Sequence, residues 1–451
     1  MTGFACAATD KLMTDTAIIL AAGLGTRMKS ARPKASHAIA GRSMLQHLIA
    51  SCQGLFDHIV VVVGPGMAEL EAQAAPHLCV VQQDRLGTAH AALQAAAHFG
   101  DGLVSVLYAD NPLISRQTIA RLQARAAVGD ADLVLLAMRP PEPGKYGRVV
   151  EQDGYVERIV EWADARPEER AIGLCNAGVL SAPAAAFRRW LQAVGAENAK
   201  GEYYLTDVVE IARRDGVRVA AIEAPFDELR GINSRAELAA AEAVMQTRLR
   251  LAAMEGGATL IAPETVFFAA DTVLAPDVVV EPHVVFGPGV TVESDAVIRA
   301  FSHLEGVHVG ARAIIGPYAR LRPGTDVGAG AHVGNFVELK AVQLGAGAKA
   351  NHLSYLGDAS VGAGSNIGAG TITCNYDGFV KTRTNIGAGC FVGSDSVLVA
   401  PVSIGDGAFV AAGSVITRDV AADAMAFGRA RQEEMPGRAA EFRAARKKGQ
   451  T

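Results

Sequence analysis

The stretch "IGAGCFVGSDSVLVAPVSIGDGAFVAAGSVI", residues 386–416, places an aliphatic residue at every sixth position and decides the fold of the second half of the chain. Six residues match neither the period of an α-helix nor the two-residue alternation of a strand. A six-residue repeat with an aliphatic residue, often followed by glycine, is typical of a parallel β-helix. Each repeat unit forms one flat side, and three units form a coil. We expect the aliphatic residues to point inward and to stack as one continuous column.

The same period extends upstream of this stretch. It runs from Val280 to Leu304 and again from Val309 to Leu339 in steps of six. The step shortens to five after Leu339 and again after Leu356, so the register slips and then recovers. Runs of this length predict a β-helix over the whole second half of the chain.

One polar insertion interrupts the repeat. Residues 374–385, "CNYDGFVKTRTN", offer turn-forming and polar side chains and no inward aliphatic residue. A loop that leaves a regular solenoid serves something other than the core. His352 stands shortly before this loop, and we expect functional side chains in this part of the β-helix.

The first half of the chain follows another pattern, in which short apolar runs alternate with helical segments. Strand and helix in alternation predict a parallel sheet covered on both faces, with ligands at the carboxyl ends of its strands. The motifs "LAAGLGTRMKSARPK" (20–34) and "YADNP" (108–112) follow two such runs, so we expect them to converge. The predicted strands are "TAIILAAG" (16–23), "HIVVVVGPG" (58–66), "LVSVLYADNP" (103–112) and "ADLVLLAMRP" (131–140).

A helix is predicted between the two halves. Ser234 is suited to cap its start, with Glu237 completing a capping box, and Gly256 and Gly257 supply the stop. We therefore expect three parts: a first domain over residues 1–235, a helical linker over 236–256, and a β-helix domain with a tail over 257–451.

Composition limits the class of protein. The 451 residues carry 42 basic and 47 acidic side chains, a net charge of −5, which gives no reason to expect a nucleic-acid partner. No apolar run approaches the roughly 18 residues of a membrane span. The six scattered cysteines predict reduced thiols, and residues 1–15 lack the apolar segment of a signal peptide. We expect a cytoplasmic protein with a short lead-in, for which Met13 is an alternative start.

A series of motifs in one order resembles the family of bifunctional N-acetylglucosamine-1-phosphate uridyltransferases and glucosamine-1-phosphate acetyltransferases. The resemblance covers residues 16–432. It implies an α/β Rossmann-like nucleotidyltransferase domain of GT-A type, a helical linker and a left-handed parallel β-helix of hexapeptide repeats. The motifs are "LAAGLGTRM", "QDRLGTAHA", "GKYGRV", "RIVEWADA", "NAKGEYYLTDV", "GINSR", "ARLRPG", "HVGNFVELK", "NHLSYLGDA", "NIGAGTITCNYDG" and "FVGSDS".

The resemblance implies two reactions. The β-helix domain would move an acetyl group from acetyl-CoA to glucosamine 1-phosphate. The first domain would then move a uridylyl group from UTP to N-acetylglucosamine 1-phosphate and release pyrophosphate. The product, UDP-N-acetylglucosamine, supplies peptidoglycan and lipopolysaccharide synthesis. The family also implies a homotrimer formed through the β-helix.

For uridylyl transfer, the resemblance implies that Arg27 and Lys34 face the triphosphate and that Asp110 and Asn233 hold Mg²⁺. Backbone N–H groups of the glycine turn would cradle the phosphates. Gln82 would read uracil by donating to O4 and accepting from N3–H, and Tyr204 and Thr206 would lie near the sugar. The implied nucleotide and sugar site comprises Leu20, Ala21, Ala22, Gly23, Lys34, Gln82, Gly87, Thr88, Tyr108, Ala109, Asp110, Gly147, Glu161, Asn176 and Asn233. Ala109 and Ala177 depart from the family, which has glycine and often threonine there.

For acetyl transfer, a neutral histidine is suited to take a proton from the attacking amine, and His352 matches the catalytic base of the family. The resemblance implies a glucosamine 1-phosphate site at Arg322, Lys340, Tyr355 and Asn366. It implies an acetyl-CoA site at Ala369, Asn375, Tyr376, Ser394, Ala412 and Arg429, in which residues of two chains would meet.

Two other interpretations compete with this one. A nucleotidyltransferase for another sugar 1-phosphate would use its β-helix only for assembly, but it would need neither His352 nor the "NYDG" loop. A regulatory subunit without chemistry would have no use for Lys34, Asp110 and Asn233 together.

Overall fold

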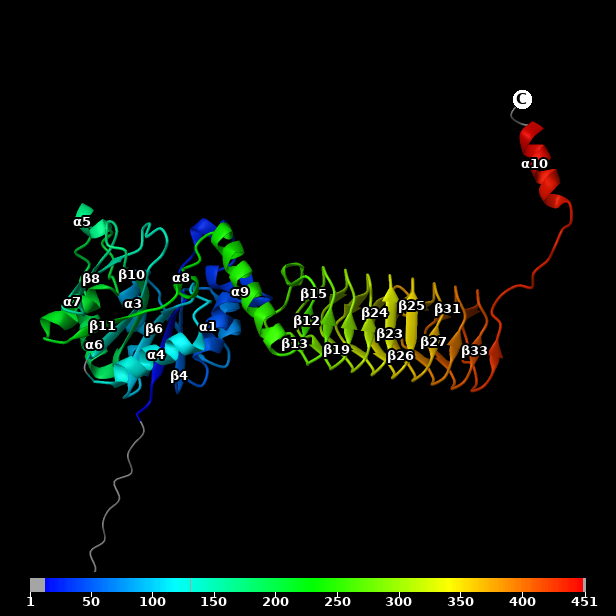
Figure 1. Cartoon of the computed structure of the whole chain (residues 1–451), viewed down its shortest axis with the longest axis horizontal. Helices are drawn as coiled ribbons and strands as arrows, with labels where there is room; N and C mark the ends of the chain where they lie inside the picture. Colours follow the sequence, from blue (N-terminus) through cyan, green and yellow to red (C-terminus); the bar gives the residue numbers. More distant parts are fainter. Residues whose placement is uncertain (1–12, 130, 449–451) are drawn as a thin grey trace, which may run out of the picture. The chain divides into compact units, whose positions relative to one another are not determined.

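A computed structural model describes residues 13–129 and 131–448 (Figure 1). The chain divides into two compact units, Met1–Arg248 and Leu249–Thr451. Most of the lead-in predicted for residues 1–15, together with Cys6, lies outside the described residues. The five cysteines that are described are free thiols. Among the described residues, no helix combines the length and the apolar character needed to cross a bilayer.

The first unit is built on a nine-stranded sheet, and its strands lie where the apolar runs predict them. The sheet order is β11-β7-β10-β6-β1-β4-β5, with the β8–β9 hairpin attached to β10. β1 pairs in parallel with β4 on one side and with β6 on the other. The strands are β1 (Thr16–Leu20), β4 (His58–Val63), β5 (Leu78–Val81), β6 (Leu103–Tyr108), β7 (Leu133–Met138), β8 (Arg148–Gln152), β9 (Tyr155–Val160), β10 (Cys175–Pro183) and β11 (Val219–Glu223); β2 (Ala38–Ile39) and β3 (Arg42–Ser43) form a separate hairpin.

The sheet is mixed: the four predicted strands β1, β4, β6 and β7 are parallel as expected, and two strands that were not predicted, β9 and β10, run antiparallel to them. β10 runs antiparallel to both β6 and β7. A buried apolar strand has the same side-chain pattern in either direction, so the sequence pattern gives no information on its polarity. The reversal places the amino end of β10 beside the carboxyl end of β7, where Cys175 pairs with Met138.

Helices cover both faces of the sheet, as the alternation predicts. Leu45, Leu70 and Ile119 place α1, α2 and α4 in one buried cluster. Phe187 and Val208 place α6 and α7, with α3, in the cluster on the other face. The helices are α1 (Met44–Cys52), α2 (Ala68–Ala74), α3 (Thr88–Gln94), α4 (Arg116–Ala127), α5 (Pro167–Arg170), α6 (Ala184–Ala193), α7 (Asp207–Arg214) and α8 (Phe226–Leu229).

α9 (Arg235–Glu255) is the helix predicted between the halves, and the boundary between the two units falls within it, after Arg248. The Ser234 hydroxyl accepts the N–H of Glu237 at 3.2 Å, as a cap should. The Glu237 carboxylate, however, accepts the N–H of Asn233 at 2.6 Å instead of that of Ser234. The predicted capping box is therefore wrong in its second bond, because the carboxylate reaches one residue further back. The helix stops before Gly257, whose φ is +96°.

The second unit is a left-handed parallel β-helix with three flat faces, whose short strands repeat along the unit in Figure 1. One face carries β12 (Thr259–Leu260), β14 (Val279–Val280), β17 (Val297–Ile298), β20 (Ile314–Ile315), β23 (His332–Asn335), β25 (Lys349–His352), β27 (Asn366–Ile367), β30 (Phe391–Val392), β33 (Phe409–Val410) and β35 (Met425–Ala426). The second carries β13 (Val273–Leu274), β16 (Thr291–Val292), β19 (Val307–Val309), β22 (Thr325–Val327), β29 (Thr384–Ile386) and β32 (Val402–Ile404). The third carries β15 (Val285–Phe286), β18 (His303–Leu304), β21 (Arg320–Arg322), β28 (Ile372–Cys374), β31 (Val397–Val399) and β34 (Val415–Ile416).

The inward column is confirmed, because every aliphatic position of the six-residue period is buried in one continuous cluster. The step from Leu304 to Val309 is also five residues, with Gly306 at the corner, and the two later five-residue steps have a clear structural basis. There, β24 (Glu338–Leu344) and β26 (Tyr355–Val361) run on around a corner as single strands that share two faces. Ala341 and Asp358 turn these corners with φ values of 52° and 48°.

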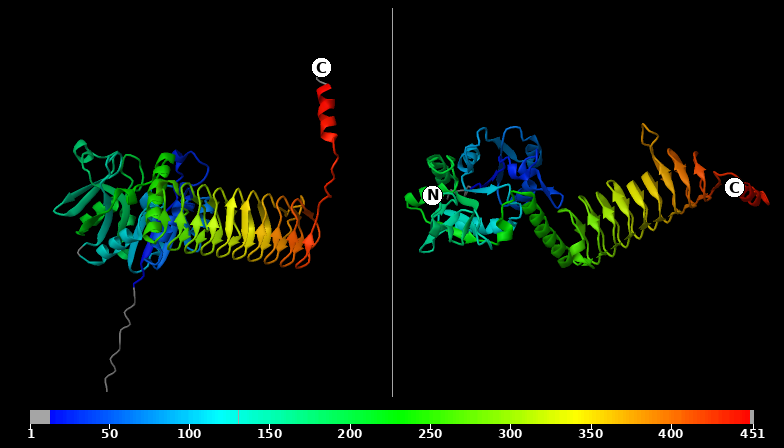
Figure 2. Two further views of the ribbon diagram at one scale, coloured as in Figure 1. Left: turned by 45° about the vertical axis from the view of Figure 1, so that its right-hand side comes forward. Right: turned by 90° about the horizontal axis from the view of Figure 1, so that it is seen from above.

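Two features project from the regular coils. At one corner, the rings of His283, Phe301, Tyr318 and Phe336 stack at centroid distances of 4.8–5.2 Å. The predicted insertion leaves the β-helix as a hairpin-like loop, visible in the right-hand view of Figure 2, with Phe379 93% exposed. A last helix, α10 (Arg438–Lys448), follows the coils in sequence.

Candidate functional sites

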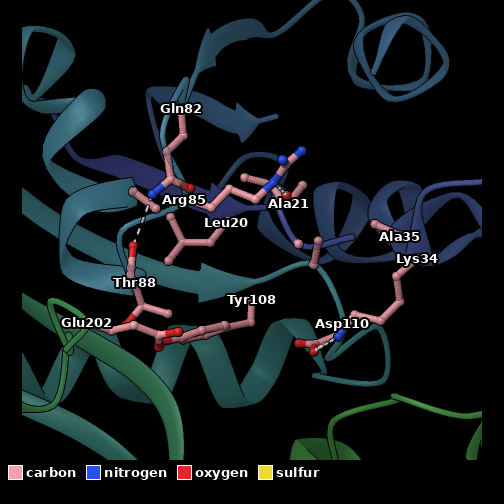
Figure 3. A pocket seen from close by; sticks show the side chains of 15 residues that line it. Leu20, Ala21, Lys34, Ala35, Gln82, Arg85, Thr88, Tyr108, Asp110 and Glu202 are labelled. Carbon is pink, nitrogen blue, oxygen red and sulfur yellow. Dashed lines mark hydrogen bonds and ion pairs between the residues drawn. The ribbon is translucent and has the colours of Figure 1, made fainter. Parts of the chain in front are cut away.

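A cavity of about 240 Å³ opens at the carboxyl ends of β1 and β6 in the first unit (Figure 3). The structure brings the glycine turn and the "YADNP" motif to this one cavity, as the sheet topology predicts. Eleven residues assigned to the nucleotide from the sequence line it: Leu20, Ala21, Ala22, Gly23, Lys34, Gln82, Gly87, Thr88, Tyr108, Ala109 and Asp110.

Lys34 and Asp110 are charged residues that line the cavity, and Asn233, which is not part of the lining, contacts Lys34. The Lys34 ammonium donates to Asp110 Oδ2 and, at 3.1 Å, to Asn233 Oδ1. The backbone N–H of Ile232 donates to the carbonyl of Asp110 at 2.9 Å, which ties the two distant segments together. The side chains of Lys34 and Asp110 are only 15% and 19% exposed, so their attraction is weakly screened.

The oxygen atoms of Asp110 and Asn233 therefore converge on one positive charge. A carboxylate and an amide carbonyl are ligands that suit Mg²⁺, which keeps several waters and binds substrate phosphates in its remaining positions. No cluster of three or more His, Cys, Asp or Glu side chains suited to a metal occurs within residues 13–129 and 131–448. The donor set fits a Mg²⁺ ion that is shared with a substrate and does not fit a closed structural metal site.

Gln82 lies at the far end of the cavity from Lys34 (Figure 3). Its amide nitrogen is 3.1 Å from the carbonyl of Gly87 and 3.0 Å from His90 Nδ1. Both N–H groups are thus engaged, and Oε1 is left for a ligand. The expected acceptance from uracil N3–H fits this arrangement, whereas the expected donation to O4 does not.

The residues assigned to the sugar form a second group, which does not line this cavity. The N–H of Asn176 donates to the carbonyl of Gly147 at 2.9 Å, and the Thr206 hydroxyl donates to Glu161 at 3.3 Å. Burial raises the pKa of Glu161. Burial, followed by the charges of nearby carboxylates, raises the pKa of Asp207 to about 6.

Four residues that line the cavity, Ala35, Arg85, Ala91 and Glu202, were not assigned from the sequence, and two of them are charged. One assigned side chain lies elsewhere. Arg85 and Glu202 line the cavity, and Arg85 Nε donates to the carbonyl of Ala22 at 2.8 Å. Both belong to motifs that were recognised, "QDRLGTAHA" and "NAKGEYYLTDV", which were the available signal. Arg27 is exposed on a turn at Thr26–Met28 and is not part of the cavity lining.

In the second unit, the register of β21, β24 and β26 places cationic side chains side by side. Arg322 pairs with Lys340 across neighbouring strands. Arg322 donates to Glu338 at 3.0 Å, and the Lys340 ammonium is 3.6 Å from Asp358. Lys381, from the projecting loop, contacts the Lys340 ammonium, which lowers the pKa of Lys381. This third cation was not assigned from the sequence.

His352 lies at the end of β25 and is exposed, so it is not enclosed by the aliphatic column. Its Nδ1 atom is 2.7 Å from Oδ1 of Asn335, its register partner on β23. Tyr355 begins β26 just beyond the corner, and Asn366 begins β27 on the same face as His352. The imidazole and the cations therefore occupy two faces that meet at one corner.

The residues assigned to acetyl-CoA follow one another along the coils. Backbone bonds link Asp395 to Ala369 at 2.7 Å and Gly413 to Ser394 at 2.8 Å, which stacks the segments of Ala369, Ser394 and Ala412. An added Cβ on Gly413 would lie 3.9 Å from the side chain of Arg429 on the next turn of the chain. Asn375 donates to Asp358, and Tyr376 is 58% exposed on the loop.

Comparison with known proteins agrees with both units. A family model described as MobA-like NTP transferase domain matches residues 17–172, and one described as hexapeptide repeat of succinyl-transferase matches residues 383–418. The bifunctional protein GlmU of Acidiphilium cryptum is 67% identical over 431 residues, which cover 96% of this chain and 99% of the relative. The proteins of the same name from Gluconacetobacter diazotrophicus and Granulibacter bethesdensis are 70% and 64% identical, and the matches cover 96% and 95% of this chain and 96% of each relative.

The fold defines a transferase of two units, a nucleotidyltransferase followed by a hexapeptide-repeat β-helix. Identity of this degree over nearly the whole chain shows that it belongs to the GlmU family of bifunctional proteins. The resemblance stated from the motifs is confirmed. The chain is an enzyme that makes UDP-N-acetylglucosamine through an acetyltransferase and a uridyltransferase activity.

Proposed function

We propose that the cavity of the first unit is the uridyltransferase site and that Lys34, Asp110 and Asn233 are its charged centre. The convergence of these three side chains is the observation that carries the proposal. The sugar phosphate is already anionic at neutral pH, so its attack on UTP needs no general base. It needs alignment of the reacting groups and neutralised charge. Lys34 supplies charge next to the glycine turn, and Gln82 Oε1 accepts from the base at the other end.

Asp110 and Asn233 would hold Mg²⁺, and the ion would neutralise charge on the phosphates. The Lys34 ammonium lies against the same two oxygens. Lys34 is thus available to pair with a phosphate when the oxygens take a metal. The aliphatic part of its side chain packs near Gly25, where an added Cβ would lie 2.5 Å from Lys34 Cβ. Gly25 therefore allows the lysine to approach the turn.

We propose that acetyl transfer takes place at the corner between His352 and the cationic cluster. His352 would accept the proton of the glucosamine amine as it attacks the thioester. Arg322, Lys340 and Lys381 would bind the phosphate of the sugar. Consecutive coils supply residues assigned to acetyl-CoA, and a flat β-helix face favours packing of copies. We therefore propose a homotrimer whose sites combine two chains, working in the cytoplasm.

A pair of variants tests this division of labour. Asp110→Ala should lower uridylyl transfer by at least about 100-fold, the loss typical of an electrostatic group that acts on the transition state. It should leave acetyl transfer unchanged. His352→Ala should do the reverse. Each reaction is measured separately by product mass, with glucosamine 1-phosphate and acetyl-CoA or with N-acetylglucosamine 1-phosphate, UTP and Mg²⁺. Equal loss of both activities in either variant would refute the assignment.

A further inference from the structure

Asn335 makes a hydrogen-bond contact with His352, the proposed base. The proposed function gives this contact no role. The two side chains meet at 2.7 Å between Asn335 Oδ1 and His352 Nδ1. An amide oxygen can only accept, so the proton of a neutral imidazole must lie on Nδ1. The lone pair is then left on Nε2. A base that takes a proton from an amine needs such a free nitrogen.

We infer that Asn335 is a positioning residue for acetyl transfer: its amide oxygen fixes the tautomer and the ring orientation of His352, leaving Nε2 as the base. The inference rests on the proposed role of His352. A neutral acceptor has a particular advantage here. A carboxylate at the same place would favour imidazolium and reduce the fraction of the histidine that is competent at neutral pH.

The backbone around this pair is held closely. The N–H of Leu353 donates to the carbonyl of Asn335 at 3.1 Å, and the N–H of Gly370 donates to that of His352 at 3.3 Å. The residue before Asn335 is Gly334, where an added Cβ would lie 2.0 Å from the carbonyl oxygen of Asn351. Neighbouring coils therefore approach so closely that only glycine fits. The separation of the two side chains is set by the coil and not by a flexible loop.

Few other titratable groups face the imidazole. His332 lies on β23 with Asn335, and its pKa is lowered by burial and then by Arg299, Lys349 and His352. Lys349 lies at the start of β25 itself. On the next coil, Asp395 approaches Gly370, where an added Cβ would lie 2.2 Å from its carboxylate. None of these forms a hydrogen bond with His352 within the described part of the chain, and Asn335 is the side chain that does.

The test compares Asn335→Leu and Asn335→Asp with the full-length enzyme. Asn335→Leu keeps the shape but removes the acceptor, so kcat for acetyl transfer should fall roughly 10- to 100-fold, as expected for loss of an orienting partner, while KM for glucosamine 1-phosphate stays within about twofold. Asn335→Asp keeps the acceptor and adds charge. It should retain more activity than the leucine variant at high pH and should move the acidic limb of the kcat/KM profile upward by about one pH unit. ¹⁵N NMR should show the Nδ1–H tautomer of His352 in the native enzyme and its loss in Asn335→Leu.

Two controls keep the outcomes separate. Asn385→Leu removes a similar polar contact between coils, Ser360 to Asn385 at 2.9 Å, and should leave acetyl transfer unchanged. Uridylyl transfer should be unchanged in every variant and reports intact protein. If His352→Ala keeps acetyl transfer, the proposed function fails. If His352→Ala is inactive but Asn335→Leu has native kcat and native pH dependence, or if native His352 carries its proton on Nε2, the inference about Asn335 is overturned.

Discussion

Arg148 is a charged residue that is almost completely buried, at 1% exposure, and no carboxylate of residues 13–129 or 131–448 pairs with it. Its guanidinium donates to backbone carbonyls, among them those of Gly144 at 2.9 Å and Arg170 at 3.2 Å. It also lies 5.0 Å from the ring of Trp162. One side chain thus organises the loop that precedes Gly147, a residue assigned to the sugar. The hydrogen bonds of Arg148 therefore hold the loop before Gly147 in place and contribute to the stability of the first unit.

Arg148→Met should lower the free energy of unfolding of the first unit by about 3 kcal/mol, because buried carbonyls would lose a charged donor. Both tryptophans of the chain, Trp162 and Trp190, lie in the first unit, so urea unfolding followed by tryptophan fluorescence reports that unit alone. Arg139→Met is the matched control: Arg139 is half-exposed and pairs with Glu223 at the surface, so the expected change is below about 1 kcal/mol. An Arg148→Met midpoint equal to that of the control would contradict this role.

The positions of the site residues were predictable from the sequence to differing degrees. Asp110 and Lys34 follow recognisable strand and turn signals, and both line the cavity. Asn335 belongs to the motif "HVGNFVELK", but nothing in that motif indicates its contact with His352. Its contact with His352 spans 17 residues, not the 18 of three six-residue units, because a five-residue step intervenes. Regular spacing would have set Gly334 opposite His352. Finding the pair requires the coil register as well as the repeat.

At the level of single elements, α7 begins at a carboxyl group whose pKa is unusual. Burial, then the charges of Glu210, Glu161 and Asp164, raise the pKa of Asp207 to about 6 from an ordinary 3.8. Between these pH values the folded state binds a proton that the unfolded state has lost. Stability must therefore decrease as the pH rises from about 4 to 6, and the loss persists at higher pH.

Asp207→Asn should remove this pH dependence. At pH 7.5 it should raise the free energy of unfolding of the first unit by about 1 kcal/mol, an amount reduced by partial solvent screening and by the favourable helix dipole at this position. At pH 4 it should have almost no effect. Tryptophan-monitored urea titrations at both pH values provide the measurement. Glu151→Gln, which alters an exposed carboxylate of the same unit that is not among the charges acting on Asp207, is the control. A gain of the same size at both pH values would show that charge is not the cause.

The helices and strands differ in how much of their structure can be predicted from the sequence pattern. The six-residue period predicted the inward residues of the β-helix because burial alone determines them, and all are buried. The direction of β10 could not be predicted in the same way, because burial is indifferent to strand polarity. The cap of α9 was predicted correctly at Ser234. The carboxylate of Glu237, however, accepts the N–H of Asn233 and not that of Ser234. Which N–H the carboxylate accepts depends on the local backbone geometry, and the residue types alone do not determine that geometry.

At the scale of the whole molecule, the buried clusters divide cleanly between the units. The two clusters of the sheet contain no buried residue beyond Leu229, and the cluster of the β-helix begins at Ala258, with Leu249 and Ala253 of α9 packed against it. Neither core takes a buried side chain from the other. Each unit therefore has what it needs to fold by itself.

A chain shortened to residues 1–257 should consequently keep uridylyl transfer within about threefold of the native rate and lose acetyl transfer altogether. It retains α9 up to its glycine stop, together with every residue assigned to the nucleotide and the sugar. The assay supplies N-acetylglucosamine 1-phosphate, UTP and Mg²⁺ and follows pyrophosphate release. Native tryptophan fluorescence shows whether the shortened chain is folded. A folded but inactive chain would mean that the two activities are not separable.

The repeating coils have a consequence for how this protein can change length. Val279 and Val297 are register partners 18 residues apart, and each turn contacts only the turns before and after it. One complete turn inserted among the early coils would lengthen the prism by about 4.8 Å and leave every pairing beyond it unaltered. Smaller changes of length are absorbed locally: the turn from Asn335 to His352 has 17 residues, and the loop at residues 374–385 leaves Asn366 paired with Phe391. Evolution can therefore adjust the reach of this unit in whole increments while the chemistry near its middle stays untouched.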